Sequence, residues 1–147
     1  MMGYPEKKRI LPPVLIDTPV WRDYFRKEGR TFQTVNKLMD AGRVCCLDLV
    51  VAELLETARS AKELKVFQDF TRIFPVLAEP PEAWVEAARL SFNLRKKGKA
   101  LPLRDCYLAH MAKVHGSFLY TTHQGLHRAR RVFGAGLRFF SERNLSS

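Results

Sequence analysis

Short runs of apolar residues recur along the chain, separated by stretches in which apolar residues return every three or four positions. The run Val14-Leu15-Ile16 follows a Pro-Pro break and is continuous, which is typical of a strand buried on both faces. Pro75 interrupts another run and predicts an edge strand there, because proline cannot donate a hydrogen bond to a ladder. The strands predicted in this way cover residues 14–16, 43–47, 73–78, 118–121 and 137–140.

The stretches between these runs have the period of amphipathic helices. One such stripe places apolar residues at i, i+3, i+4 and i+7, namely Val51, Leu54, Leu55 and Ala58. Asp48 stands before this stripe, where a helix N-cap is expected. The predicted helices cover residues 20–27, 31–41, 48–58, 62–71, 82–97, 104–115 and 124–132. This alternation predicts an α/β fold in which helices cover both faces of a parallel sheet.

The composition fits a single soluble domain. The chain has 147 residues, 46% of them hydrophobic and 27% charged, which is enough for one core without a disulfide or zinc staple. The three cysteines form no disulfide framework or CxxC pattern, so we expect buried thiols in a reducing cytoplasm. The apolar stretch near the start is broken by Pro12 and Pro13 and ends at Asp17, too soon for a secretory signal. The sequence contains no run of about 18 apolar residues, so it predicts no membrane span.

Three acidic residues stand at positions suited to a metal site. Asp17 follows the first predicted strand, Glu53 lies in an apolar helix, and Asp105 opens a later helix. Each has a simpler explanation: Asp17 as a helix cap, Glu53 as a solvated side chain, and Asp105 as an acid favoured by the helix dipole. Together, carboxylates on three separate elements supply the oxygen ligands that Mg²⁺ or Mn²⁺ requires. Ligands of open parallel sheets bind beyond the carboxyl ends of the strands, so we expect the three to converge there.

Positive charge is concentrated in one part of the chain. Lys and Arg number 25 against 15 Asp and Glu, a net charge of +10. Residues 95–131 contain nine of these cations and one acid, Asp105, and so carry +8 of the total. The stretch predicts contacts with the phosphates of a nucleic acid, although a merely solvated basic face remains the alternative. The candidate RNA-binding residues are Arg95, Lys96, Lys97, Lys99, Arg104 and Arg128.

Several motifs occur in the order typical of one family. The first reads Asp17-Thr18-Pro19-Val20-Trp21 with Asp23-Tyr24, and the second reads Ala52-Glu53-Leu54-Leu55. Later come Leu103-Arg104-Asp105-x-x-Leu108-Ala109 and the strand-like Phe118-Leu119-Tyr120-Thr121. With this order and spacing, residues 14–140 resemble the PIN-domain ribonucleases of the VapC toxin type.

The resemblance implies a fold and an activity for the whole chain. It implies a single PIN-like domain over residues 1–147, with a short N-terminal extension at 1–13 and a three-layer α/β/α sandwich around a mainly parallel sheet. It further implies a Mg²⁺- or Mn²⁺-dependent endoribonuclease that leaves a 5′ phosphate. In that reading Asp17, Glu53 and Asp105 hold the metal, while Thr18 and Thr121 assist. Such a protein is the toxin of a type II toxin–antitoxin pair, acts in the cytoplasm, forms a homodimer and is inhibited by a small antitoxin.

The chain departs from the family pattern at the last motif. A fourth acid is usual there, but His123 and Gly125 stand in its place, and residues 106–141 contain no Asp or Glu. His123 could replace the missing acid as a ligand, since imidazole suits Mn²⁺ better than Mg²⁺, or it could be a surface histidine without a role. The missing acid leaves an alternative function open, a catalytically weak or inactive PIN-like module that binds RNA or a protein partner.

Overall fold

A four-stranded parallel sheet forms the centre of the protein. The computed structural model describes residues 11–146, and its strands are β1 (Val14–Ile16), β2 (Val44–Cys45), β3 (Phe118–Tyr120) and β4 (Arg138–Phe139). Their order in the sheet is β2-β1-β3-β4, and each neighbouring pair is parallel. This arrangement confirms the predicted α/β fold. Of the expected N-terminal extension at 1–13, residues 1–10 lie outside the described residues.

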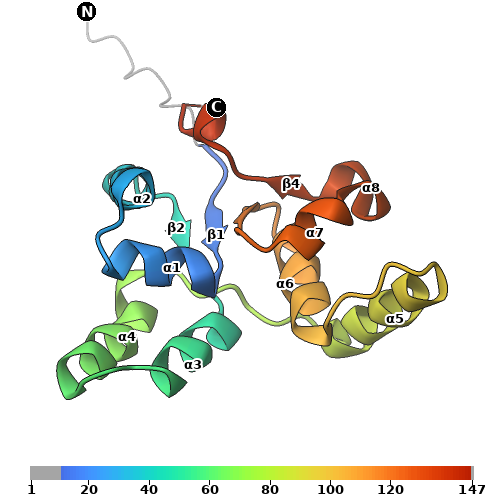
Figure 1. Ribbon diagram of the computed structural model, residues 1–147, viewed down its shortest axis with the longest axis horizontal. Coiled ribbons are helices and arrows are strands. Elements are labelled where there is room, and N and C mark those ends of the chain that lie inside the picture. The colour runs from blue at the N-terminus through green and yellow to red at the C-terminus, as the bar shows by residue number, and fades with distance from the viewer. Residues whose placement is uncertain (1–10, 147) are drawn as a thin grey trace, which may run out of the picture.

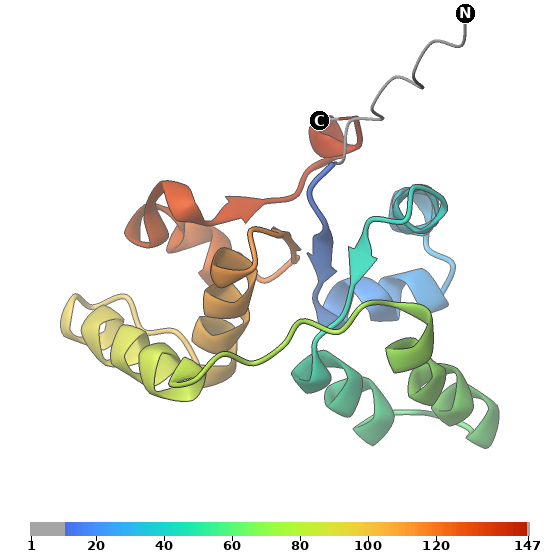
Figure 2. The same cartoon turned by 180° about the vertical axis from the view of Figure 1, so that it is seen from behind.

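Eight α-helices flank the sheet in the described part of the chain. Figure 1 shows α1 to α4 gathered on one side of β1 and α5 to α8 on the other. In Figure 2, the view from the opposite side, the segment between α4 and α5 crosses in front from one group to the other. The helices are α1 (Thr18–Phe25), α2 (Gly29–Asp40), α3 (Asp48–Glu56), α4 (Ala61–Ile73), α5 (Ala83–Lys96), α6 (Leu103–Val114), α7 (Gln124–Arg128) and α8 (Arg130–Phe133).

The structure differs from the predicted elements at three places. Residues 73–78 form only a single parallel bridge, between Cys46 and Val76, because Pro75 has no N–H to continue a ladder. The helix predicted at 124–132 is two short helices that meet at Ala129; the buried residues Leu126, Ala129 and Phe133 keep helical spacing across the break, so the apolar period does not distinguish one helix from two. Asp48 is the first residue of α3 and not its N-cap, a position that the helix dipole also favours for an acid.

An aromatic cluster holds α1 against α4. The ring of Trp21 on α1 lies 4.7 Å from that of Phe70 and 5.7 Å from that of Phe74, measured between centroids. Phe25 adds an edge-to-face contact with Phe67 at 5.1 Å. Such ring pairs bury large apolar areas and have restricted geometry. They fix the start of α1, and therefore Asp17, at the carboxyl end of β1.

The cysteines are buried and unpaired, as the sequence predicts. Burial raises the pKa of Cys45 to about 12 and that of Cys46 to about 11, so both remain thiols at neutral pH. Within residues 11–146, no helix is both long and apolar enough to cross a membrane.

A candidate active site at the carboxyl end of the sheet

Asp17 combines a helix-capping role with a place at the centre of the candidate site. The chain leaves the buried strand β1 at Ile16, and Asp17 is the N-cap of α1, where its Oδ1 accepts a hydrogen bond from the backbone N–H of Thr18 at 2.8 Å. The hydroxyl of Thr121, just past β3, donates to Oδ2 at 2.7 Å. Asp17 is 0% exposed. The cap that the sequence offered as an alternative is therefore present, and it leaves lone pairs on both oxygens for other partners.

Glu53 reaches the same place from α3. Its Oε1 accepts a hydrogen bond from the hydroxyl of Thr18 at 2.9 Å, which links α3 to the first turn of α1. The side chain is half-buried, unlike the fully solvated glutamate considered as the alternative. Thr18 and Thr121 thus orient two of the three acids, each through one hydroxyl.

Asp105 is buried near the start of α6 and contacts His123. Nδ1 of His123 lies 3.1 Å from Oδ2 of Asp105, and the backbone N–H of His123 donates to the hydroxyl oxygen of Thr121 at 3.0 Å. A Cβ at Gly125 would lie 2.9 Å from Cε1 of His123 and 3.2 Å from Leu101. Gly125 therefore leaves room for the histidine ring beside Asp105. The two residues that depart from the family pattern therefore act together, because His123 contacts Asp105 and Gly125 leaves space for the histidine ring.

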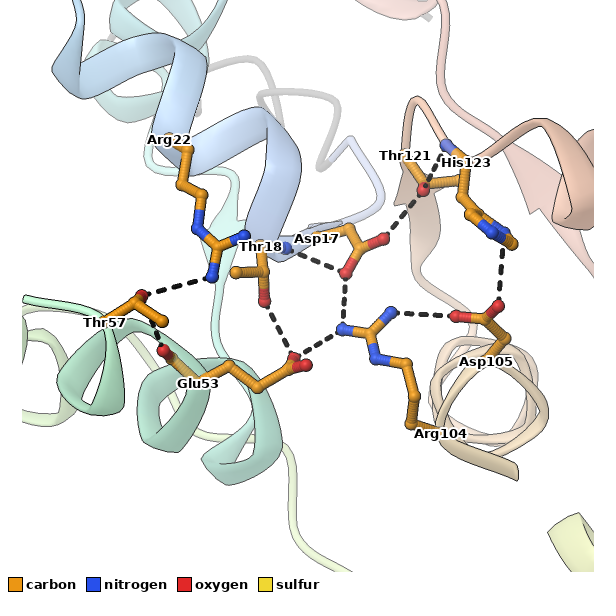
Figure 3. Close-up of polar contacts among 9 residues, drawn as sticks. All are labelled: Asp17, Thr18, Arg22, Glu53, Thr57, Arg104, Asp105, Thr121 and His123. Atoms are coloured by element: carbon orange, nitrogen blue, oxygen red, sulfur yellow. Dashed lines mark hydrogen bonds and ion pairs between the residues drawn. The ribbon is translucent and has the colours of Figure 1, made fainter. Parts of the chain in front are cut away.

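Arg104 lies in the middle of the three carboxylates. Figure 3 shows its guanidinium between them, with Nη2 donating to Oδ1 of Asp17 at 2.9 Å and to Oε1 of Glu53, and Nη1 donating to Oδ1 of Asp105 at 2.9 Å. The sequence grouped Arg104 with the RNA-binding residues, yet its charged end points into the cluster. Only 27% of the side chain is exposed. The three acids contact one guanidinium, so a cation of the chain itself links them.

The charges around Arg104 keep it protonated. Burial by itself lowers the pKa of Arg104, but the hydrogen bonds to Asp17 and Glu53, the charge of Asp17 and the hydrogen bond to Asp105 together outweigh it. The net effect raises the pKa of Arg104 above its ordinary value. A guanidinium cannot lose its proton at physiological pH, so this position is cationic throughout that range.

The donor chemistry of the cluster suits a hard divalent cation, although the present arrangement is closed around Arg104. Three carboxylates, at the N-cap of α1, on α3 and on α6, supply the oxygen ligands that Mg²⁺ and Mn²⁺ prefer. Over residues 11–146, no group of three or more His, Cys, Asp or Glu side chains is placed to hold one metal ion. The carboxylate oxygens accept hydrogen bonds from the planar guanidinium of Arg104. This geometry differs from that of ligands arranged around a single metal ion.

Two of the candidate RNA-binding residues lie beside this cluster. Lys99 and Arg128 line one hollow of about 380 Å³, whose wall includes Gly125, next to His123. Arg95 and Lys96, at the end of α5, lie over the ring of Phe92 at 5.7 and 5.3 Å. Lys97 follows them at the C-cap of α5 and is exposed. The sequence prediction missed the position of Arg104; its place directly before Asp105 at a helix start was the signal available.

Comparisons with known proteins identify the fold. The family model of the PIN domain matches residues 14–132 of the chain. FitAcB from Neisseria gonorrhoeae is 21% identical with a TM-score of 0.60, covering 87% of this chain and 96% of that chain. DNA-bound VapBC from Salmonella typhimurium is 19% identical with a TM-score of 0.64, covering 88% and 98%. A toxin–antitoxin complex from Klebsiella pneumoniae is 19% identical with a TM-score of 0.54, covering 84% and 94%. No curated protein sequence matches the chain.

Proposed function

This chain belongs to the PIN domain family, and from that premise we propose that it is a metal-dependent endoribonuclease, the toxin of a type II toxin–antitoxin pair. One observation carries the proposal. Asp17, Glu53 and Asp105 come from three different elements and contact a single cation at the carboxyl end of the sheet. Burying two carboxylates there is costly unless a cation compensates them, so the fold maintains a site for positive charge.

The residues of this cluster would hold Mg²⁺ or Mn²⁺, and their neighbours would orient them. When bound, the ion supplies Lewis-acid chemistry for hydrolysis of a phosphodiester. Thr121 fixes Asp17 and Thr18 fixes Glu53, each by a hydroxyl hydrogen bond, so both carboxylates are oriented before substrate arrives. His123 contacts Oδ2 of Asp105, the oxygen that Arg104 does not use. Prior orientation of this kind lowers the cost of reaching the reactive geometry.

The basic residues beside the cluster would bind the RNA backbone. Lys99 and Arg128 line the hollow next to His123 and can each contact a phosphate, while Arg95, Lys96 and Lys97 continue the positive surface along the end of α5. Contacts of this type position RNA without reading its sequence. We also propose a homodimer that acts in the cytoplasm and is inhibited by a small antitoxin; the fold shared with the Klebsiella pneumoniae toxin–antitoxin complex supports such a partner.

A second candidate function is a PIN-like module that binds RNA or protein without cleaving RNA. Two observations favour it: Arg104 occupies the middle of the carboxylates, and His123 stands where the family has an acid. Such a module would keep the basic surface and the fold, but would need no divalent ion.

An RNA cleavage assay separates the two functions. The purified protein is incubated with end-labelled RNA in Mg²⁺, in Mn²⁺ and in EDTA, beside Asp17→Asn and the control Asp40→Asn. Asp40 is an exposed acid at the end of α2, so the control removes the same charge outside the cluster. We expect cleavage that depends on metal and is lost by at least about 100-fold in Asp17→Asn only. RNA binding without cleavage by the folded native protein in either metal would support the binding module instead.

A further inference from the structure

The guanidinium of Arg104 uses the same oxygens that a metal ion would need. Nη2 bridges Asp17 and Glu53, and Nη1 holds Asp105, so one cation contacts all three carboxylates (Figure 3). Oδ1 of Asp17 already accepts from the backbone N–H of Thr18, and Oδ2 accepts from Thr121. The oxygens of Asp17 therefore have little capacity left for another ligand while Arg104 is in place.

Removing Arg104 from the cluster without replacement would be unfavourable. Asp17 and Asp105 are buried, and a buried carboxylate that loses its counter-ion becomes an uncompensated charge. A second cation can supply that compensation. A divalent ion offers twice the charge of a guanidinium at the same position and suits carboxylate oxygens equally well. The cluster thus requires a cation, and either a guanidinium or a divalent ion can supply the positive charge.

Arg104 is strongly held at its tip and less well held along its stem. Its Nε is buried and has no hydrogen-bond partner in the described part of the chain. An unpaired buried donor is a cost of the inward position that an outward rotamer, with Nε in water, would remove. Arg104 is the second residue of α6, directly after the loop that carries Lys99, and part of its side chain is exposed. The side chain can therefore turn outward toward the basic surface while α6 stays in place.

From these contacts we infer that Arg104 is a built-in counter-ion that competes with the divalent metal for Asp17, Glu53 and Asp105. The inference rests on the proposed function, since it takes the cluster as the metal site. Without metal, the inward guanidinium neutralises part of the cluster and keeps the buried acids in position. With metal, Arg104 is displaced and its five N–H donors become available to a phosphate of the RNA beside Lys99 and Arg128. Binding of the metal and exposure of Arg104 to the RNA are therefore coupled.

Calorimetric titration of Mn²⁺ into three proteins tests the competition. Arg104→Gln removes the competing charge and should bind Mn²⁺ at least tenfold more tightly than the native protein. Arg104→Lys retains one positive charge without the planar fork and should bind with intermediate affinity. The matched control is Arg22→Gln, because Arg22 lies near the cluster but donates to the hydroxyl of Thr57 and not to one of the three carboxylates. The control should bind Mn²⁺ within twofold of the native protein.

A second readout follows Arg104 itself. In the native protein labelled with ¹⁵N, the Nε–Hε resonance assigned by its absence from Arg104→Gln should shift on addition of Mg²⁺ and not of NaCl at equal ionic strength. If Arg104→Gln is unstable, Mn²⁺ should raise its melting temperature by more than that of the native protein, because the ion replaces the lost cation.

The outcomes separate this inference from the proposed function. Native-like or weaker Mn²⁺ affinity in a folded Arg104→Gln would overturn the competition while leaving a metal site in place. Equal gains in Arg104→Gln and Arg22→Gln would reduce the effect to net charge and also overturn it. If neither the native protein nor Arg104→Gln binds Mn²⁺ or Mg²⁺, the metal-dependent function fails, and the inference fails with it.

Discussion

Two arginines, one half-buried and one buried, lie at opposite ends of the parallel sheet and are held by partners of different charge. Arg104, at the carboxyl end, is held by three carboxylates. Arg43 precedes β2 at the amino end and is 4% exposed. Its Nε donates to the carbonyl of Pro12 at 3.0 Å, and its Nη1 donates to the carbonyls of Asn144 at 2.6 Å and Leu145 at 3.1 Å. All three of these acceptors are neutral backbone groups.

The pKa values of the two arginines shift in opposite directions. Burial lowers the pKa of Arg43, because carbonyl dipoles replace water only in part. Nearby anions raise the pKa of Arg104 despite burial. Both remain protonated at neutral pH, so the difference lies in what each position can exchange. In the proposed function the carboxylates that hold Arg104 exchange it for a metal ion, whereas the carbonyls around Arg43 join segments far apart in the chain and carry no net charge. One end of the sheet is a cation site, and the other is a structural clamp.

Among the tests of the difference between the two ends of the sheet, the largest effect is expected when Arg43, the structural clamp at the amino end, is replaced. Arg43→Met should lower the free energy of unfolding by about 3 kcal/mol, because carbonyls of Pro12, Asn144 and Leu145 lose their donors. Urea denaturation followed by circular dichroism measures this loss. Mn²⁺ should stabilise this variant no more than it stabilises the native protein, since the acceptors that Arg43 leaves behind are neutral carbonyls. Selective rescue of Arg43→Met by Mn²⁺ would break the distinction between the two ends.

A smaller effect is expected when charge is added at the carboxyl end. His123→Asp places a fourth acid beside Asp105, which should tighten Mg²⁺ binding by about tenfold, because a divalent ion gains twice as much as Arg104 from the added charge. Calorimetry against His115→Asp provides the control, since His115 is exposed at the other end of α6. Unchanged affinity in His123→Asp would show that position 123 lies outside the coordination geometry.

The comparison also shows how far the sequence could be interpreted. Apolar runs located the four strands, together with a fifth predicted strand at 73–78 that forms only a bridge, and they led us to expect Asp17, Glu53 and Asp105 at the carboxyl end of the sheet. The partners of Arg43 and Arg104 were out of reach. Arg43 donates to the carbonyl of Asn144, about a hundred positions away along the chain. Arg104 donates to Glu53, and the helices α4 and α5 lie between these two residues in the sequence. Local patterns give the period of an element, but they do not give the direction in which a long charged side chain turns.

Beside the carboxyl end, the basic surface should dominate the electrostatics of RNA binding. The substitution Arg95/Lys96/Lys97→Gln removes three cations at the end of α5. Each phosphate contact that is lost on single-stranded RNA should make the plot of log K against log salt less steep by about 0.7, or by about 2 for all three contacts.

The matched variant is Arg130/Arg131/Arg138→Gln. These arginines line a hollow of about 1190 Å³ along β4, which also reaches Pro12 near the amino end. Fluorescence anisotropy with a labelled single-stranded RNA between about 50 and 200 mM salt measures both slopes. We expect the α5 variant to flatten the slope and the β4 variant to change it by less than half as much, because the three α5 cations lead into Lys99, which lines the hollow that includes Gly125. An equal change in both would mean that RNA contacts both ends of the sheet, and the functional division between them would not extend to the surface.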